Sequence, residues 1–272
     1  MLNLHRALEV ATTAARRGGD CLMKYRGQLK DIQTKSASGD LVTEADLASE
    51  KIVLQVLTDY FPNHGILAEE SGAHQETPTK TNTPSDYLWA VDPLDGTLNY
   101  AHGLPFFCVS IGLTYKNQPV VGVVYAPYLK ELYQAIAPES LALLNGNAIQ
   151  VSQADTLEQS LLATGFPYRR GEMADNNYAE FMHLANQTQG IRRPGSAALD
   201  LCFVAAGRYE GYWEKHLNPW DLAAGAALVT AAGGRVSGYQ GKTLDLDSGA
   251  IVASNGHIHP LLIQQLAQVR TP

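Results

Sequence analysis

The chain has 272 residues, of which 45% are hydrophobic and 17% are charged, so it has enough apolar side chains for one large core or two joined ones. Its formal net charge of −7 argues against a general nucleic-acid-binding surface. We find no apolar run as long as a membrane span and no apolar signal-peptide segment, and we therefore expect a cytoplasmic protein.

The first part of the chain alternates helices with short strands. Apolar residues at helical spacing predict an amphipathic helix over 4–25. A short strand is expected at 31–35, followed by a small polar loop at 36–40 that we expect to be mobile. A second amphipathic helix is predicted to run from just after Thr43 to about residue 60, and a buried strand is predicted at 65–68.

The middle of the chain is typical of antiparallel sheet. A polar run at 72–86, rich in Thr and Pro, predicts an exposed, flexible excursion. Apolar strands are predicted at 106–115 and 119–125, and the polar residues between them indicate a hairpin. A further strand at 132–136 and an Asn-Gly turn at 145–146 extend the same pattern.

From about residue 154 the pattern changes to short strands that alternate with helices. The predicted strands lie at 160–165, 211–214 and 250–253, and the predicted helices lie near 174–188, 196–207, 220–233 and 257–269. Such alternation predicts an α/β arrangement. No linker-like run separates the halves, so we expect one compact unit with an α+β half at 1–153 and an α/β half at 154–272.

Three cysteines, Cys21, Cys108 and Cys202, lie far apart in the sequence. Their odd number and the absence of a C-x-x-C motif indicate neither a zinc knuckle nor a disulfide framework. Each lies among apolar residues, and we expect three buried thiols in a reducing compartment.

The stretch from Trp89 to Tyr100 combines a buried strand with polar groups of unusual density. Its apolar residues end at two carboxylates three residues apart, Asp92 and Asp95, and Pro93 between them is expected to end the strand. The following Gly-Thr pair can bring unpaired backbone amides close to those carboxylates. Carboxylates and unpaired amides placed together in this way can hold divalent cations and a phosphate. The five residues 92–96, Asp-Pro-x-Asp-Gly, also suit an ordinary surface turn.

Two other acidic groups lie where elements begin or end. Glu69 follows the strand predicted at 65–68, and Asp221 stands in the first turn of an Ala-rich helix. Either residue alone has a structural interpretation, because an acidic side chain in the first turn suits the helix dipole. Together with Asp92 and Asp95, however, they form a set of oxygen ligands of the kind that Mg²⁺ prefers.

At these positions the chain resembles the inositol monophosphatase family. The matching segments are 39–43, 68–71, 89–100, 195–200 and 213–225, in the order in which the family has them. The combination of Asp-Pro-x-Asp-Gly-Thr with Trp-Asp-x-Ala-Ala-Gly is highly specific. The resemblance implies an α+β fold layered α-β-α-β-α, the sugar-phosphatase sandwich, which is usually dimeric and has its active site between the two halves. It also implies Mg²⁺-dependent hydrolysis of phosphate monoesters.

The resemblance implies a metal-binding role for five of these residues. A first Mg²⁺ would be held by Glu69, Asp92 and the carbonyl of Leu94, and a second by Asp92, Asp95 and Asp221. A third, weaker ion would be held by Glu69 and water. We therefore expect two or three magnesium ions.

The resemblance also implies roles in catalysis and substrate binding. Thr97, oriented by Asp46, would help deprotonate a metal-bound water, with Glu69 as a further catalytic residue. The substrate would be bound at Asp95, at Gly96 and Thr97, whose amides would meet the phosphate, and by residues that contact the alcohol part, which are Gly195, Ser196, Ala197 and Glu214.

The sequence thus favours a phosphomonoesterase that acts on myo-inositol monophosphates by in-line attack of a metal-activated water. Relatives of the same fold hydrolyse histidinol phosphate, fructose 1,6-bisphosphate or 3′-phosphoadenosine nucleotides, and these substrates remain alternatives. An alternative of another class is a non-catalytic protein that binds metal in the acidic cleft and a partner on its surface. We expect a small-molecule phosphate monoester as ligand and a homodimer, with no membrane partner; a nucleic-acid partner is disfavoured.

Overall fold

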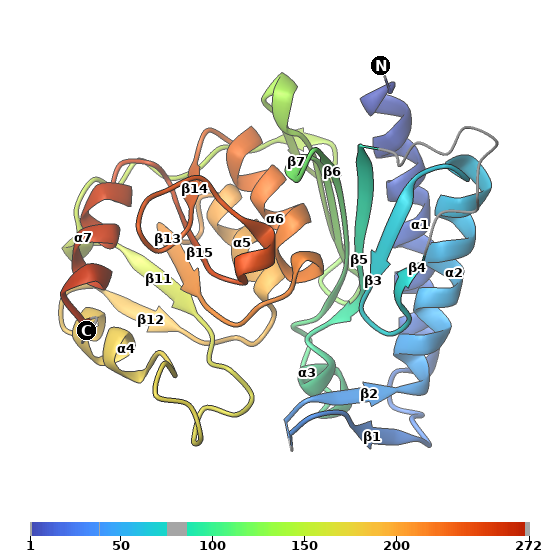
Figure 1. Cartoon of the computed structure of the whole chain (residues 1–272), viewed down its shortest axis with the longest axis horizontal. Coiled ribbons are helices and arrows are strands. Elements are labelled where there is room, and N and C mark those ends of the chain that lie inside the picture. The colour runs from blue at the N-terminus through green and yellow to red at the C-terminus, as the bar shows by residue number, and fades with distance from the viewer. Residues whose placement is uncertain (1, 38, 75–85, 270–272) are drawn as a thin grey trace.

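The computed structural model describes residues 2–37, 39–74 and 86–269. Helices and sheets alternate in five layers, α-β-α-β-α, from the N-terminal helix pair to the C-terminal helix (Figure 1). The layered fold predicted from the sequence is therefore confirmed. In the described residues, no helix is both long enough and apolar enough to cross a membrane.

The outer layer of the first half consists of helices α1 (Leu4–Tyr25) and α2 (Glu44–Tyr60). They pack on one face of an eight-stranded sheet whose strand order is β10-β9-β8-β7-β6-β5-β3-β4. The strands are β3 (Gly65–Ala68), β4 (Gly72–His74), β5 (Tyr87–Asp95), β6 (Cys108–Tyr115), β7 (Gln118–Ala126), β8 (Glu131–Ile136), β9 (Leu141–Leu144) and β10 (Asn147–Ala148). Only β3 and β5 are parallel neighbours, so their carboxyl ends meet at one edge.

The middle layer consists of α5 (Ala197–Ala205) and α6 (Pro219–Ala231), which lie between the two sheets. Helix α6 can approach the large sheet closely because Gly112 and Gly122 face it, and a Cβ on either would overlap Ala223 or Ala224. The small residues of the Trp-Asp-x-Ala-Ala-Gly segment therefore have a packing role. This close packing brings the first turn of α6 to the end of β5.

The second sheet has the strand order β12-β11-β13-β15-β14. Its strands are β11 (Leu161–Thr164), β12 (Gly190–Arg192), β13 (Gly211–Glu214), β14 (Arg235–Ser237) and β15 (Ile251–Ser254), and helices α4 (Tyr178–Ala185) and α7 (His259–Val269) cover its outer face. The remaining elements are β1 (Ile32–Thr34), β2 (Leu41–Thr43), α3 (Thr97–Ala101) and three single 3₁₀ turns at 137–139, 157–159 and 246–248.

Most predicted elements are confirmed, including the hairpin between β6 and β7 and the Asn-Gly turn, in which Asn145 and Gly146 both have positive φ. All three cysteines are buried and free. Of the excursion predicted at 72–86, the first residues form β4 and residues 75–85 lie outside the described residues. Residue 38 of the loop predicted at 36–40 is also outside them.

Three predictions were wrong in detail. Pro93 does not end its strand, because β5 continues to Asp95 with a shift in register between Asp92 and Asp95, where the missing N–H of Pro93 costs no ladder hydrogen bond. The helix predicted at 174–188 is only eight residues long and begins after Asn177, which has a left-handed backbone. The second sheet is mixed, since β15 is antiparallel to both of its neighbours, so the α/β alternation is only partial.

Candidate active site

The turn from β5 into α3 depends on glycine at position 96. Gly96 has a φ of 91°, in the left-handed region, and a Cβ there would lie 2.8 Å from the carbonyl oxygen of Phe106. No side chain caps the short helix that follows. The backbone amides at this turn therefore remain open to an anion.

The hydroxyl of Thr97 lies between two acceptors. Its Oγ1 is 2.9 Å from the carbonyl oxygen of Leu94 and 3.0 Å from Oδ1 of Asp46. Asp46 is fully buried in the first turn of α2, and its other carboxylate oxygen accepts hydrogen bonds from the amide and hydroxyl of Thr43. Burial raises the pKa of Asp46 to about 6, although these hydrogen bonds oppose the shift. Asp46 can therefore accept a proton close to neutral pH.

Asp92 and Asp95 lie on either side of the irregularity in β5, and both are buried. Oδ1 of Asp92 accepts the amide of Leu94 at 2.9 Å. Oδ2 of Asp95 accepts the hydroxyl of Ser196 at 2.6 Å and the amide of Ala198 at 2.8 Å. Burial raises the pKa of Asp92 well above its usual range and that of Asp95 to about 6, and repulsion from neighbouring carboxylates adds to both shifts.

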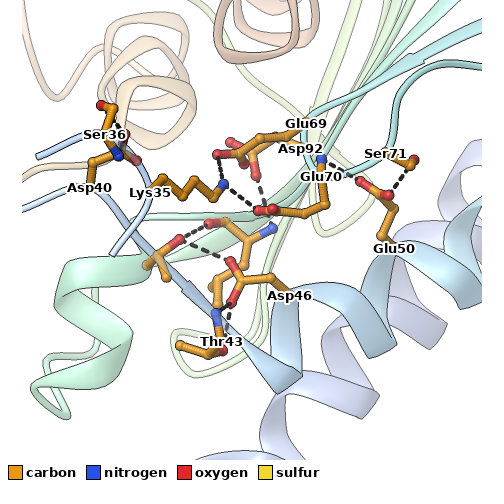
Figure 2. Close-up of polar contacts among 12 residues, drawn as sticks. Lys35, Ser36, Asp40, Thr43, Asp46, Glu50, Glu69, Glu70, Ser71 and Asp92 are labelled. Carbon is orange, nitrogen blue, oxygen red and sulfur yellow. Dashed lines mark hydrogen bonds and ion pairs between the residues drawn. The ribbon is translucent and has the colours of Figure 1, made fainter. Parts of the chain in front are cut away.

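Glu69 leaves the end of β3 and lies beside Asp92 (Figure 2). Lys35, which follows β1, places its Nζ 2.8 Å from Oε1 of Glu69 and 2.5 Å from Oε1 of Glu70. Burial disfavours this ammonium group, but attraction and hydrogen bonds from both carboxylates outweigh it and raise the pKa of Lys35. A positive charge thus sits within the acidic cluster.

Asp221 reaches the cluster from the middle layer. It stands in the first turn of α6, where its Oδ2 accepts the amide of Asn218 at 2.7 Å in a capping box. Burial raises the pKa of Asp221 well above its usual range, and the carboxylates of Asp95 and Glu69 raise it further. The carboxylates of residues 69, 92, 95 and 221 therefore repel one another, and each would be stabilised by a nearby cation.

A cavity of about 380 Å³ opens beside these carboxylates. Its lining includes seven of the predicted residues, which are Glu69, Asp95, Gly195, Ser196, Ala197, Glu214 and Asp221. The other five, Asp46, Asp92, Leu94, Gly96 and Thr97, are joined to this set through the contacts described above. The structure thus brings together all twelve predicted site residues.

Glu214 lines the same cavity and lies at the end of β13. Its carboxylate accepts the hydroxyl of Tyr212 and lies so close over Gly165 that a Cβ at that position would overlap it. Burial raises the pKa of Glu214 to about 7, while the hydrogen bond from Tyr212 and the charge of Arg193 oppose this shift. The carboxylate is therefore poorly hydrated and faces a space that a polar ligand could fill.

Several residues that support the site were not predicted from the sequence. Asn99 donates to the carbonyl oxygens of Phe106 and Pro194 at 2.8 Å each, which ties α3 to the segment before Gly195. Glu50 on α2 accepts the amide of Glu70 at 2.9 Å and the hydroxyl of Ser71, which fixes the segment that follows β3 (Figure 2). Lys35 and Gly165 were also missed, because no local spacing relates them to their distant carboxylate partners.

The donor set fits a hard divalent cation. Its members are carboxylate oxygens and one backbone carbonyl, and burial followed by repulsion between the carboxylates raises the pKa values of the aspartates. Among the described residues, no three acidic, histidine or cysteine side chains already form a metal cage.

Comparisons with known proteins identify the family. The family model described as the inositol monophosphatase family matches residues 3–271 of the chain. The chain belongs to the inositol monophosphatase family. A relative from Synechocystis sp. named inositol-1-monophosphatase is 50% identical over 260 residues, which cover 96% of this chain and 88% of the relative. A Pseudomonas aeruginosa relative named Nus factor SuhB is 42% identical over 251 residues, 91% of each chain.

Solved structures of this family share the five-layered fold. Inositol monophosphatase from Anabaena (Nostoc) sp. matches with a TM-score of 0.88 and 48% identity, over 99% of this chain and 98% of that one. Thermotoga maritima IMPase matches with a TM-score of 0.86 and 32% identity, over 97% and 98% of the two chains. This member of the inositol monophosphatase family is therefore a phosphatase, and hydrolysis of phosphate monoesters is its class of reaction.

Proposed function

We propose that this phosphatase hydrolyses myo-inositol monophosphate to inositol and phosphate with the help of Mg²⁺. The observation that carries the proposal is the cavity itself, whose lining combines the carboxylates of Glu69, Asp95 and Asp221 with the partly buried carboxylate of Glu214. The first three suit cations and a phosphate, and Glu214 suits the hydroxyl groups of a polyol.

We propose the metal ligands by their position. Glu69, Asp92 and the Leu94 carbonyl would hold one ion, and Asp92, Asp95 and Asp221 would hold a second. A third, weaker site would use Glu69 and water. Bound Mg²⁺ would supply Lewis-acid stabilisation of the phosphoryl oxygens and would lower the pKa of water.

The chain's own contribution to proton transfer lies at Thr97. A Thr hydroxyl that passes its proton to Asp46 can accept one from an attacking water, and the 3.0 Å separation of the two oxygens permits this transfer. Thr43 holds the carboxylate in place through two hydrogen bonds. The open amides of residues 96 and 97 would meet the negative phosphate.

Polar groups in the cavity bear on the choice among the candidate substrates. Glu214, the buried Asp200 and Arg193 all line the cavity. The two carboxyl groups can accept hydrogen bonds from the hydroxyls of a polyol, which makes inositol monophosphate the first candidate. Histidinol phosphate stays as the second candidate, because its cationic amine would be attracted to an ionised Glu214. The guanidinium group of Arg193 could meet a second phosphate, so the bisphosphates stay in the panel.

The experiment that tests the proposal is a phosphate-release assay over a panel of monoesters with saturating Mg²⁺. We expect the highest kcat/KM for inositol 1-phosphate among inositol 1-phosphate, histidinol phosphate, fructose 1,6-bisphosphate and a 3′-phosphoadenosine nucleotide. A higher value for histidinol phosphate would replace the polyol assignment, and turnover of none of them would exclude all four.

We further propose that the protein is a homodimer, as the resemblance to its family implies. We also propose that it is cytoplasmic, because three free buried thiols suit a reducing compartment. Sedimentation at micromolar concentration tests the dimer. A purely partner-binding role, suggested by relatives named Nus factor SuhB, is less well supported, since the proposed metal ligands are all present.

A further inference from the structure

Asp200 is a buried carboxyl group for which the fold supplies no partner at one oxygen. It lies in the first turn of α5, and its side chain is 1% exposed. Its Oδ1 is buried and makes no hydrogen bond with any residue that the structure describes. Burial without a hydrogen bond is costly for any carboxyl group, so a residue of this kind normally has a partner that is either protein, water or ligand.

The surroundings of Asp200 indicate a ligand. Asp200 belongs to the lining of the cavity, together with Glu214 and Arg193. Burial raises the pKa of Asp200 well above its usual range, and the charges of Glu214 and Asp95 add to this shift, whereas Arg193 opposes it only in part. The rest of α5 packs in the core, and an apolar residue at this position would avoid the cost of burying a carboxyl group.

Glu214 alone offers a ligand only part of its hydrogen-bonding capacity. One of its oxygens is occupied by the hydroxyl of Tyr212, so that its remaining oxygen offers most of its capacity to a ligand. That oxygen can hold one hydroxyl of a polyol. A second acceptor on a different element would fix the orientation of the ring.

We propose that Asp200 is a second substrate-binding residue, which accepts a hydrogen bond from a hydroxyl of the alcohol part and acts together with Glu214. This inference rests on the proposed function, and it names the substrate class more narrowly as an alcohol with at least two hydroxyl groups. The carboxyl groups come from α5 in the middle layer and β13 in the second sheet, and both residues line the cavity.

The test compares two substrates of the same ring size, myo-inositol 1-phosphate and cyclohexyl phosphate, which has no hydroxyl groups on its ring. We expect Asp200→Ala to lower kcat/KM for inositol 1-phosphate by about 10- to 100-fold, mainly through KM, since the contact is remote from the reacting bond. For cyclohexyl phosphate the change should stay within about twofold. Asp200→Asn keeps one carbonyl acceptor and should show a smaller loss. Asp247→Asn on the exposed surface is the control for charge.

The outcomes separate this inference from the proposed function. An equal loss on both substrates, or no loss on either, would overturn the role of Asp200 while wild-type turnover of inositol 1-phosphate still supports the function. If wild-type enzyme prefers another hydroxylated substrate of the panel, the function is revised and the same comparison is made with that substrate. Melting curves of all variants check folding, and Asp200→Asn carries the test if Asp200→Ala does not fold.

Discussion

The hydroxyl oxygen of Thr97 lies 3.0 Å from Oδ1 of Asp46, although the two residues are 51 positions apart. Asp46 also completes the capping box of α2 through Thr43. One carboxylate thus begins a helix and orients the hydroxyl at the proposed catalytic centre. The same hydrogen bonds that hold α2 in place therefore fix the position of the proposed base.

This relationship predicts a pH dependence. Burial raises the pKa of Asp46 to about 6, and only the ionised form can take the proton of Thr97. Activity should therefore rise with pH and level off above about pH 6, or somewhat lower when bound Mg²⁺ adds positive charge. Asp46→Asn should lower kcat by one or more decades and remove this limb. A pH–kcat profile of both proteins at saturating Mg²⁺ checks the prediction, and an unchanged limb in the variant would contradict it.

Thr97→Ala should lower kcat more than it changes KM, because it removes the hydroxyl that relays the proton and leaves the backbone amides in place. Thr97→Ser retains the hydroxyl and serves as the matched control. Steady-state kinetics on inositol 1-phosphate distinguish the two effects. Equal kcat values for Thr97→Ala and Thr97→Ser would rule out the relay.

Metal dependence follows from the donor set. Activity should vanish in excess chelator and return with Mg²⁺, but less well or not at all with Ca²⁺, whose looser coordination misplaces the reacting groups. Asp92→Asn, which keeps the shape of a proposed shared ligand, should lower kcat by orders of magnitude in a protein that melts like the wild type. Full turnover in excess chelator, or near-normal turnover of the variant, would contradict the assignment.

Recognition of the alcohol part can be tested with two substitutions, one at Glu214 itself and one at Gly165 beneath its carboxylate. Glu214→Gln should lower kcat/KM for inositol 1-phosphate by about one to two decades, because a charge-assisted hydrogen bond contributes roughly 1.5–3 kcal/mol. Gly165→Ala should have a similar effect, since its Cβ would displace the same carboxylate. Turnover of 4-nitrophenyl phosphate, which has no ring hydroxyls, should change little. Gly171→Ala, where a Cβ meets open space, is the control.

The stability of the metal-free protein should depend on pH with a defined sign. Burial raises the pKa of Asp46 to about 6 and those of Glu70 and Glu214 to about 7. Between their unfolded and folded pKa values the folded state binds more protons than the unfolded state, so stability falls as pH rises through about 4 to 7. In chelator, the melting temperature should be higher at pH 5.5 than at pH 8. Mg²⁺ should raise the melting temperature at pH 8. If the melting temperature in chelator is instead lower at pH 5.5 than at pH 8, these carboxylates are not destabilised by burial.

The sequence by itself determined most of the elements and the acidic motifs. Helical spacing located α1 and α2, and two apolar runs joined by polar residues located β6 and β7, since these patterns are local. The two acidic motifs indicated a metal site because residue type and order within a few positions restrict the chemistry. The sequence did not reveal the continuation of β5 through Pro93, since only pairing with β6 shows that the register shifts there.

Only the tertiary structure decided which distant groups meet. Lys35 forms an ion pair with Glu69, 34 positions away in the sequence, and Gly165 leaves room for the carboxylate of Glu214, 49 positions away. No local pattern encodes either contact. Asp200 could be read from the sequence only as an acidic residue in the first turn of a helix, which is an ordinary stabilising arrangement. Its lack of a hydrogen bond at one oxygen appears only once α5 is buried between two sheets and the cavity stands beside it. Desolvation is a property of the assembled layers, and so the folded structure, rather than the residue type, makes this carboxyl group a candidate ligand of the substrate.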